Sequence, residues 1–266
     1  DMTDSSNLNS IIQEIQPNEV YNLAAQSHVA LSFEMPEYTA QVDALGTLRI
    51  LESIRTQNFN NIRFYQASTS ELYGKVKEIP QNENTPFNPR SPYAVSKVFG
   101  HYIVKNYRES YNLFAVSGIL FNHESPFRGE EFVTRKITKG LTDIKNDKLN
   151  CLKLGNIYSK RDWGYAKEYV EAMWKMLQQK KPEDFVISTG KTFSIKEFIN
   201  LSTQYLGLKT KWQNKGLKEK LINLENNKTI IKISKKFFRP AEVDILIGNS
   251  KKANKILKWS PKTDLK

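Results

Sequence analysis

Short runs rich in β-branched and aromatic residues alternate with segments of helical periodicity through the first half of the chain. This alternation limits the possible folds more than any other feature of the sequence. The strand-like runs occupy residues 19–24, 62–67 and 113–120, and the helical segments occupy 8–15, 38–54 and 93–107. Strands that alternate with helices predict a parallel sheet with helices on both faces. We therefore expect an α/β fold with a doubly wound parallel sheet.

The second half of the chain is more mixed. Residues 166–177 predict an amphipathic helix, and 184–188 predict a short strand. Ser194 followed by Glu197 has the spacing of a capping box, which predicts a helix over residues 195–205. Residues 207–236 are rich in lysine and asparagine and show no clear period. One further helical face comes from a set of apolar residues at spacings of three and four: Val133, Ile137, Leu141 and Ile144.

The composition favours a folded chain with a real core, since 39% of its residues are hydrophobic. The formal charge of +12 suggests nucleic acid, but the lysines lie singly and no basic stripe interleaves with aromatic residues. We therefore expect no nucleic-acid partner and interpret the charge as a solvated surface that also attracts anionic ligands. No apolar run approaches the ~20 residues that span a bilayer, so we expect no membrane partner. Cys151 is the single cysteine, which predicts a buried structural thiol, no metal site and a cytoplasmic location.

The most informative short pattern is Tyr93-Ala94-Val95-Ser96-Lys97 at the start of a predicted helix. The i, i+4 spacing puts the Tyr93 phenol and the Lys97 ammonium on one helix face. A free tyrosine has a pKa of about 10, and a neighbouring ammonium favours the phenolate, which makes Tyr93 a candidate base. The pattern alone is equally compatible with an ordinary amphipathic helix. It gains weight from Thr69 and Glu71, which follow a predicted strand where α/β sheets bind ligands.

Longer runs carry a family resemblance. Residues 64–97 (FYQASTSELYGKVKEIPQNENTPFNPRSPYAVSK) closely resemble the GDP-mannose 4,6-dehydratases, an extended short-chain dehydrogenase type of enzyme. Similar runs are YNLAAQSHVALSFEMPEYTA from Tyr21, GILFNHESPFRGEEFVTRKI from Gly118 and LGNIYSKRDWGYAKEYV from Leu154. PEDFVISTG from Pro182 and FFRPAEVDILIGN from Phe237 complete the match, which therefore extends over almost the whole chain.

The resemblance implies a catalytic cycle on GDP-mannose. Its catalytic residues correspond to Thr69, Glu71, Tyr93 and Lys97. Tyr93, helped by Lys97 and Thr69, would take the proton from the hydroxyl on carbon 4 while NADP accepts a hydride. Glu71 would then move a proton from carbon 5 to the departing hydroxyl of carbon 6. The expected product is GDP-4-keto-6-deoxymannose.

The resemblance also implies which residues bind ligands. Those expected to contact NADP are Asp1, Met2, Leu23, Ala24, Ala25, Gln26, Ser27, Tyr38, Lys97, His123 and Arg128. Those expected to contact the GDP-sugar are Asn122, Val133, Lys136, Arg161, Arg239 and Glu242. Arginine and lysine suit a pyrophosphate because they form charge-assisted hydrogen bonds. Without the resemblance, most of these residues would be interpreted as surface charges or strand ends. Tyr165 departs from the family, which usually has histidine there.

The family fold is Rossmann-like, and it opens with a strand and a Gly-rich turn that this chain lacks. We therefore expect a chain whose N-terminal βαβ part is missing, with roughly 60 further residues upstream of Asp1. Residues 1–121 would be the rest of the NADP-binding domain. Residues 122–266 would mainly bind the GDP-sugar, with a segment at about 151–180 returning to the Rossmann sheet. The family also suggests a homo-oligomer, either a dimer or a tetramer.

Two other interpretations stay open at this point. A sugar-nucleotide 4-epimerase of the same superfamily would need oxidation and reduction at carbon 4 but no carboxylate at position 71. A catalytically incompetent fragment would retain the fold without cofactor binding. Release of water from the substrate distinguishes the first alternative from a dehydratase, and titration with NADP tests the second.

Overall fold

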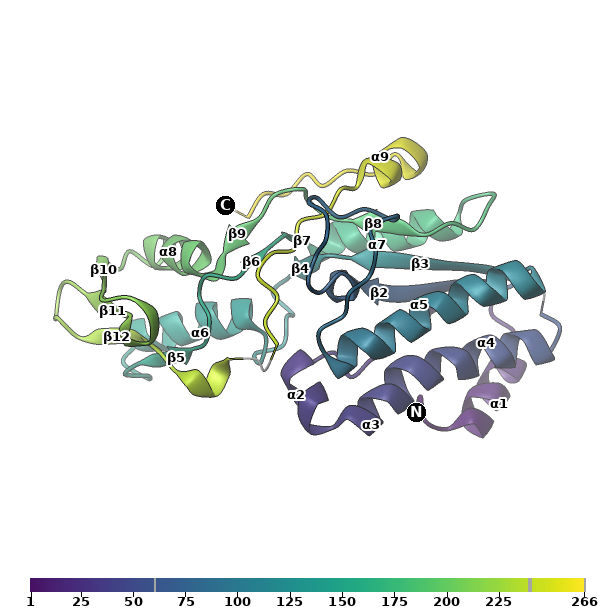
Figure 1. The fold of residues 1–266 in the computed structure, drawn as a ribbon, viewed down its shortest axis with the longest axis horizontal. Coiled ribbons are helices and arrows are strands. Elements are labelled where there is room, and N and C mark those ends of the chain that lie inside the picture. Colours follow the sequence, from purple (N-terminus) through teal and green to yellow (C-terminus); the bar gives the residue numbers. More distant parts are fainter. Residues whose placement is uncertain (60, 239–240, 266) are drawn as a thin grey trace. The chain divides into compact units, whose positions relative to one another are not determined.

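The computed structural model describes residues 1–59, 61–238 and 241–265, and its polypeptide forms two compact units (Figure 1). The first unit contains residues 1–123, 162–191 and 246–264. The second contains 124–161, 192–245 and the C-terminal end. The segment that returns to the first unit therefore begins at Asp162, and a second returning segment follows near the C-terminus. The architecture is α/β, with a parallel sheet and covering helices, as expected from the alternation of patterns.

The first unit is built on a four-stranded parallel sheet with the order β1-β2-β3-β8. Its strands are β1 (Glu19–Asn22), β2 (Arg63–Thr69), β3 (Phe114–Leu120) and β8 (Phe185–Ile187). Each begins and ends within two residues of its expected range. Asn22 lies beside Gln66 in the register, and Thr69 lies beside Leu120, so these strands present their carboxyl ends at one edge of the sheet.

Helices cover both faces of this sheet (Figure 1). On one face, α1 (Ser5–Ile15), α4 (Gly46–Thr56) and α5 (Pro92–Tyr111) pack on Phe64 and Ala115. On the other face, α7 (Ala166–Leu177) and α9 (Lys251–Leu257) pack on Tyr65 and Val116. Adjacent residues of one strand point to opposite faces because the side-chain period of a strand is two. The sheet is therefore doubly wound and covered on both sides, which explains why β3 and β8 are mostly apolar and almost fully buried.

The helix expected over residues 38–54 is one helical path of three parts. It contains α3 (Pro36–Ala40), a π-helical turn η1 (Gln41–Leu45) and α4, and a short helix α2 (Val29–Glu34) precedes it. The wider π turn shifts the direction of side chains relative to a regular helix, and π turns are often found at functional sites. After β2 the chain enters a 3₁₀ turn, η2 (Ser70–Leu72).

The second unit has its own sheet and core. Its strands, in the order β10-β11-β12-β5, are β10 (Thr210–Gln213), β11 (Lys220–Asn223), β12 (Thr229–Ile233) and β5 (Leu152–Leu154). The region 207–236, which showed no period, therefore contributes three strands and the 3₁₀ turns η3 (Gly216–Lys218) and η4 (Lys235–Phe237). Two helices, α6 (Val133–Lys145) and α8 (Ile195–Tyr205), supply the rest of the core. The capping box at Ser194 and Glu197 is confirmed.

Four short strands complete the fold: β4 (Asn122–Glu124), β6 (Lys160–Arg161), β7 (Trp163–Tyr165) and β9 (Phe193–Ser194). Cys151 is half-buried just before β5, so the expectation of a fully buried thiol was wrong. Among the described residues, no helix combines the length and the apolar character that crossing a membrane requires. Nor do these residues include three or more acidic, histidine or cysteine side chains grouped as metal ligands.

Candidate active site

The carboxyl edge of the parallel sheet collects most of the candidate residues of the first unit. Residues 23–27 follow β1, Thr69 ends β2 and Glu71 follows it, and Asn122 and His123 follow β3. Parallel strands deliver their following loops to one edge, which is where α/β sheets bind ligands. These residues are far apart in the sequence, and the sheet order brings them to the same edge.

The first two turns of α5 lie against this edge. Ser91 caps the helix by accepting a hydrogen bond from the Ala94 backbone N–H at 3.1 Å. Tyr93, in the first turn, has 7% of its surface exposed, and Lys97, one turn later, has 4%. The Lys97 ammonium donates to the Ala67 carbonyl oxygen at 2.8 Å, two residues before Thr69. This bond places the cation at the end of β2.

The β2–η2 junction is tied to the start of α5 through the intervening loop. The Thr69 hydroxyl accepts a hydrogen bond from the Glu71 backbone N–H at 3.2 Å and so caps η2, which leaves Glu71 half-buried. The Asn88 N–H donates to the Leu72 carbonyl at 3.0 Å, shortly before α5 begins. Contacts between α5 and both β2 and η2 complete the junction. The chain segments that carry the four catalytic candidates are therefore joined in one small region.

A buried carboxylate that sequence reasoning missed acts on this region. Asp43, in the π turn η1, has only 1% of its surface exposed. Burial raises the pKa of Asp43 to about 6, and the nearby positive charge of Lys97 opposes that rise. Burial also lowers the pKa of Lys97, and Asp43 opposes that fall. The available signal was an acidic residue between the apolar Val42 and Ala44, inside a helix with a buried face.

The backbone after β1 is held by the same carboxylate. The Gln26 N–H donates to Asp43 Oδ1 at 2.7 Å, and the Gln26 side chain donates to the Thr39 hydroxyl at 3.0 Å. The neighbouring Leu23, Ala24 and Ser27 are exposed, so they offer backbone and small side chains to a ligand. Ala25 is half-buried.

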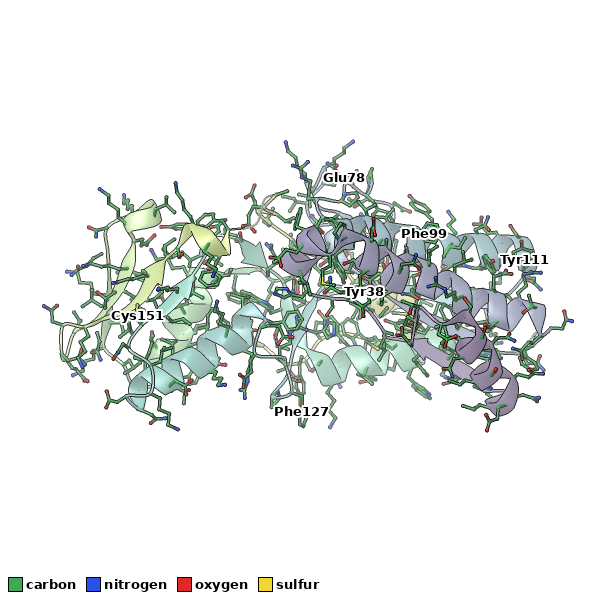
Figure 2. All side chains as sticks on the ribbon, turned by 90° about the horizontal axis from the view of Figure 1, so that it is seen from below. Tyr38, Glu78, Phe99, Tyr111, Phe127 and Cys151 are labelled. Atoms are coloured by element: carbon green, nitrogen blue, oxygen red, sulfur yellow. The ribbon has the colours of Figure 1, made fainter. Side chains whose placement is uncertain are left out.

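The remaining candidates of the first unit occupy separate positions. The His123 ring stacks on Tyr169 with centroids 4.7 Å apart, and its Nδ1 lies 2.9 Å from the Phe121 carbonyl oxygen. Asn122 is half-buried beside it. Tyr38 is 49% exposed on α3 (Figure 2). At the N-terminus, the carbonyl of Met2 accepts from Arg49 at 2.9 Å, and Asp1 is exposed.

The second unit carries the other candidates, with Val133 at the start of α6. The Arg161 guanidinium is buried and donates to the Val243 carbonyl at 2.8 Å, so it is not a free surface charge, and the half-buried Glu242 precedes Val243. Lys136 Nζ lies 3.8 Å from the ring centre of Phe237. Arg239 lies outside the described residues. Arg128, the last of these candidates, forms an ion pair with Glu124 at 3.4 Å and lies over the Phe132 ring.

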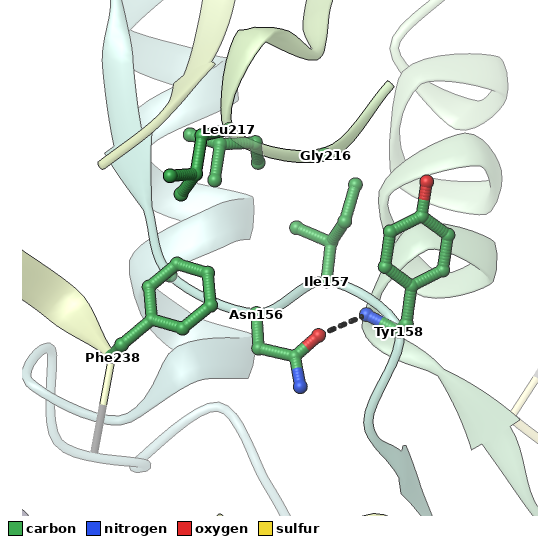
Figure 3. A pocket seen from close by; sticks show the side chains of 8 residues that line it. Asn156, Ile157, Tyr158, Gly216, Leu217 and Phe238 are labelled. Carbon is green, nitrogen blue, oxygen red and sulfur yellow. Dashed lines mark hydrogen bonds between the residues drawn. The ribbon is translucent and has the colours of Figure 1, made fainter. Parts of the chain in front are cut away.

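A pocket opens within the second unit beyond the end of β5 (Figure 3). Ile157, Leu217 and Phe238 give it largely apolar walls. Asn156 also lines the pocket, and its Oδ1 accepts a hydrogen bond from the Tyr158 N–H at 2.9 Å. A flat apolar ring is the kind of group that such a surface can bind.

The doubly wound parallel sheet, with a Tyr-x-x-x-Lys helix at its carboxyl edge, defines a Rossmann-like enzyme of the short-chain dehydrogenase class. Solved structures with this fold include RMD from Pseudomonas aeruginosa, complexed with NADPH, at a TM-score of 0.83 and 23% identity. That match covers 100% of this chain and 82% of the other. DesIV, a dTDP-glucose 4,6-dehydratase from Streptomyces venezuelae with NAD bound, matches at 0.82 and 19% over 99% of this chain and 74% of its own.

Sequence comparison narrows the class to one family. The GDP-mannose 4,6 dehydratase family model matches residues 1–266. A GDP-mannose 4,6 dehydratase of Drosophila melanogaster is 57% identical over 265 residues, which are 98% of this chain and 67% of that protein. The Vibrio cholerae GDP-mannose 4,6-dehydratase is 55% identical over 272 residues, 98% of this chain and 73% of that protein. The chain belongs to the GDP-mannose 4,6-dehydratase family.

Proposed function

We propose that this protein converts GDP-mannose to GDP-4-keto-6-deoxymannose, with NADP as a cofactor that each reaction cycle regenerates. Family membership at more than half identity supports the reaction. The observation that carries the assignment of residues is the hydrogen bond from Lys97 to the Ala67 carbonyl, which brings the ammonium to the strand end that continues into Thr69 and Glu71.

The proton transfers are assigned to side chains of this chain. Tyr93 takes the proton from the hydroxyl on carbon 4, and the Thr69 hydroxyl bonds to the same oxygen. Lys97 stabilises the negative charge that Tyr93 carries as a base. Glu71 removes the proton on carbon 5, which the adjacent ketone has made acidic, and delivers it to the departing hydroxyl of carbon 6. The proton that Tyr93 took from the carbon 4 hydroxyl is returned to carbon 5 when carbon 6 regains the hydride, so the net loss is one water. A carboxylate suits this second task because it can accept and release a proton at neutral pH.

The residues at the sheet edge fit a nicotinamide cofactor. When bound, NADP supplies a hydride acceptor for carbon 4 and a hydride donor for carbon 6. Among the described residues, the buried Ser68 Oγ at this edge has no hydrogen-bond partner. An unpaired buried hydroxyl is rare, and a polar ligand at this edge would satisfy it. The residues proposed to hold the cofactor are Asp1, Met2, residues 23–27, Tyr38, Lys97, His123 and Arg128.

The preference for NADP over NAD is part of the proposal. It is supported by the family and by the NADPH in the Pseudomonas aeruginosa structure, while the Streptomyces venezuelae structure contains NAD. Measuring the Kd of both cofactors for the purified protein tests this preference. A tighter Kd for NAD would contradict it.

The residues assigned to the GDP-sugar come mainly from the second unit. Lys136 and Arg161 would meet the pyrophosphate, and Glu242 would accept a hydrogen bond from a ribose hydroxyl. Asn122, Val133 and Arg239 complete the proposed set. The apolar pocket at Ile157 and Phe238 would take the guanine ring, since a flat aromatic base suits its walls.

We also propose a cytoplasmic homo-oligomer, and the single cysteine suits a reducing compartment. Val95, Phe99 and Tyr102 are exposed at helical spacing on α5, and Phe99 is visible in Figure 2. An exposed apolar row of this kind favours contact with a second copy. Sedimentation or light scattering of the purified protein tests the oligomeric state, and a monomer would contradict the proposal.

A 4-epimerase is the second candidate function. It would invert carbon 4 without losing water, and it would have no use for a carboxylate at position 71. Mass spectrometry of the product after incubation with GDP-mannose and NADP distinguishes the two reactions. A product lighter by one water supports the dehydratase, and a product of unchanged mass supports the epimerase.

The Glu71→Gln variant sharpens the same experiment. It keeps the size of the side chain but cannot carry the proton, so we expect loss of water to fall by about 10²–10⁴-fold. Glu78→Gln is the matched control, because Glu78 is exposed in the loop that follows η2. Equal rates in the two variants would remove Glu71 from the mechanism.

A further inference from the structure

Asp43 is a buried acid that the proposed chemistry does not use. It lies in the π turn between α3 and α4, and its Oδ1 accepts the Gln26 N–H at 2.7 Å. Accepting this one hydrogen bond requires only a side-chain oxygen, which a neutral asparagine at this position would also provide. The buried negative charge therefore requires a separate reason, since burying an unpaired carboxylate is costly.

The surroundings of Asp43 point to Lys97. Its Oδ2 is buried and has no hydrogen-bond partner among the described residues. The Thr47 hydroxyl lies 3.0 Å from the Asp43 carbonyl oxygen and 3.3 Å from Gln66 Oε1. Gln66 precedes Ala67, the acceptor of the Lys97 ammonium. The two charges are therefore close enough for each to shift the pKa of the other. The close packing of α5 on η1 explains this proximity. A Cβ on Gly100, three residues after Lys97, would lie 3.4 Å from the Asp43 carbonyl oxygen.

Other charged groups near the π turn are engaged elsewhere. Arg49 of α4 donates to the backbone and side chain of Gln41, on the exposed side of the turn. On the side of Lys97, the Ala67 carbonyl is a neutral partner. The titratable groups nearest to it in the adjoining segments are Tyr93 and His101, one turn to either side on α5, and Glu71 of η2. Asp43 is thus the negative charge that acts on Lys97 among these groups.

We propose that Asp43 is a positioning residue that holds Lys97 as a charged ammonium at the end of β2. This inference rests on the proposed function, in which Lys97 supports Tyr93 as a base. A desolvated ammonium next to one neutral carbonyl would lose its proton readily, and an opposite charge nearby prevents this. The π turn contributes by directing an acidic side chain into the interior, where a regular helix has an apolar residue.

The test is the Asp43→Asn variant, studied as the cofactor-loaded enzyme. Asparagine keeps an oxygen for the Gln26 N–H, so a merely structural role of Asp43 would leave the pH profile unchanged. We expect the alkaline limb of the kcat profile to move to lower pH by about one unit or more, because partner charges shift a pKa by ~1–3 units. The control is Glu37→Gln on the exposed surface of α3, with an unchanged profile.

A second measurement does not depend on the reaction. The Tm values of Asp43→Asn, Lys97→Met and the double variant form a double-mutant cycle. If the two charges are coupled, the double variant loses less than the sum of the single losses, by at least about 2 °C. Should Asp43→Asn fail to fold, a double variant that folds supports the coupling, and one that also fails overturns it.

The two readouts separate the inference from the function on which it rests. If the wild-type enzyme releases no water from GDP-mannose, the proposed function fails, and the Tm cycle still decides whether Asp43 and Lys97 are coupled. Additive Tm losses, or an alkaline limb that stays in place in an active Asp43→Asn enzyme, overturn the inference.

Discussion

Gly74→Ala offers a strong test of how the site is assembled, because this glycine lies where the β2–η2 junction meets the segment before α5. Gly74 has φ +50°, and a Cβ there would lie 1.9 Å from the Asn88 carbonyl oxygen. Backbone atoms cannot yield as a flexible side chain would. The segment at Asn88 must therefore move away, and it leads directly into the helix that carries Tyr93.

The expected cost can be worked out from the contacts. A left-handed backbone costs an alanine ~1–2 kcal/mol. Two backbone hydrogen bonds of Asn88 are at stake, from the Lys75 N–H at 3.1 Å and to the Leu72 carbonyl at 3.0 Å, and losing each costs about 1 kcal/mol. The free energy of unfolding should thus fall by roughly 3 kcal/mol, which lowers Tm by about 10 °C. A displacement of about 1 Å between Tyr93 and Glu71 should lower kcat by about 10²-fold.

The control is Gly207→Ala, since Gly207 has φ +70° and no atom within 4 Å of an added Cβ. It carries only the conformational cost, so its Tm should fall by a few degrees and its kcat should not change. Thermal unfolding and water release from GDP-mannose are measured for both variants. Equal Tm losses and an unchanged kcat in Gly74→Ala would refute the view that the Asn88 contacts position the site.

Three further results are expected. Tyr93→Phe should lower kcat by about 10²–10⁴-fold with little change in KM, because it removes the base but not the ring; steady-state kinetics checks this. Phe238→Ala should raise KM for GDP-mannose by up to about tenfold with kcat unchanged, since one aromatic contact is worth ~0.5–1.5 kcal/mol; an unchanged KM would remove the guanine ring from the pocket. Burial raises the pKa of Asp43 from an ordinary 3.8 to about 6, so the folded state holds this proton more tightly and loses stability as pH rises through that interval. Unfolding of wild type and Asp43→Asn at pH 4 and 6.5 should differ in their pH dependence by about 2 kcal/mol, with wild type losing more, and parallel curves would contradict the assignment.

The sequence predicted the parts of this fold whose signal is local. Four strands of the first sheet and the helices at 8–15, 93–107 and 166–177 follow from apolar periodicity. The Ser194–Glu197 capping box was also found correctly, because both partners lie within one turn. The family match named the candidate side chains, and the assembly of those that follow β1, β2 and β3 at one edge followed from the rule that parallel strands deliver their loops together.

Residues 207–236 illustrate what local patterns cannot decide. In β11 and β12 the buried residues come in short runs, 221–223 and 230–231, next to lysines, so they show no period of two. Their burial arises only when β11 and β12 pair and pack on the core of the second unit. Likewise, the division of the chain into units depends on segments that return after long excursions. Such contacts depend on how segments far apart in the sequence pack together, and a short stretch of sequence does not contain that information.

Asp43 and Lys97 show the same limit at the site itself. The sequence alone determined that Lys97 lies one helical turn from Tyr93, since that spacing is built into a helix. Only the tertiary structure decided that the ammonium would be buried beside the Ala67 carbonyl, and that a carboxylate more than fifty residues earlier in the chain would act on it. The physical reason is that the interaction between two charges depends on their separation and on the dielectric constant around them. Both are set only when α5 packs against η1 and β2.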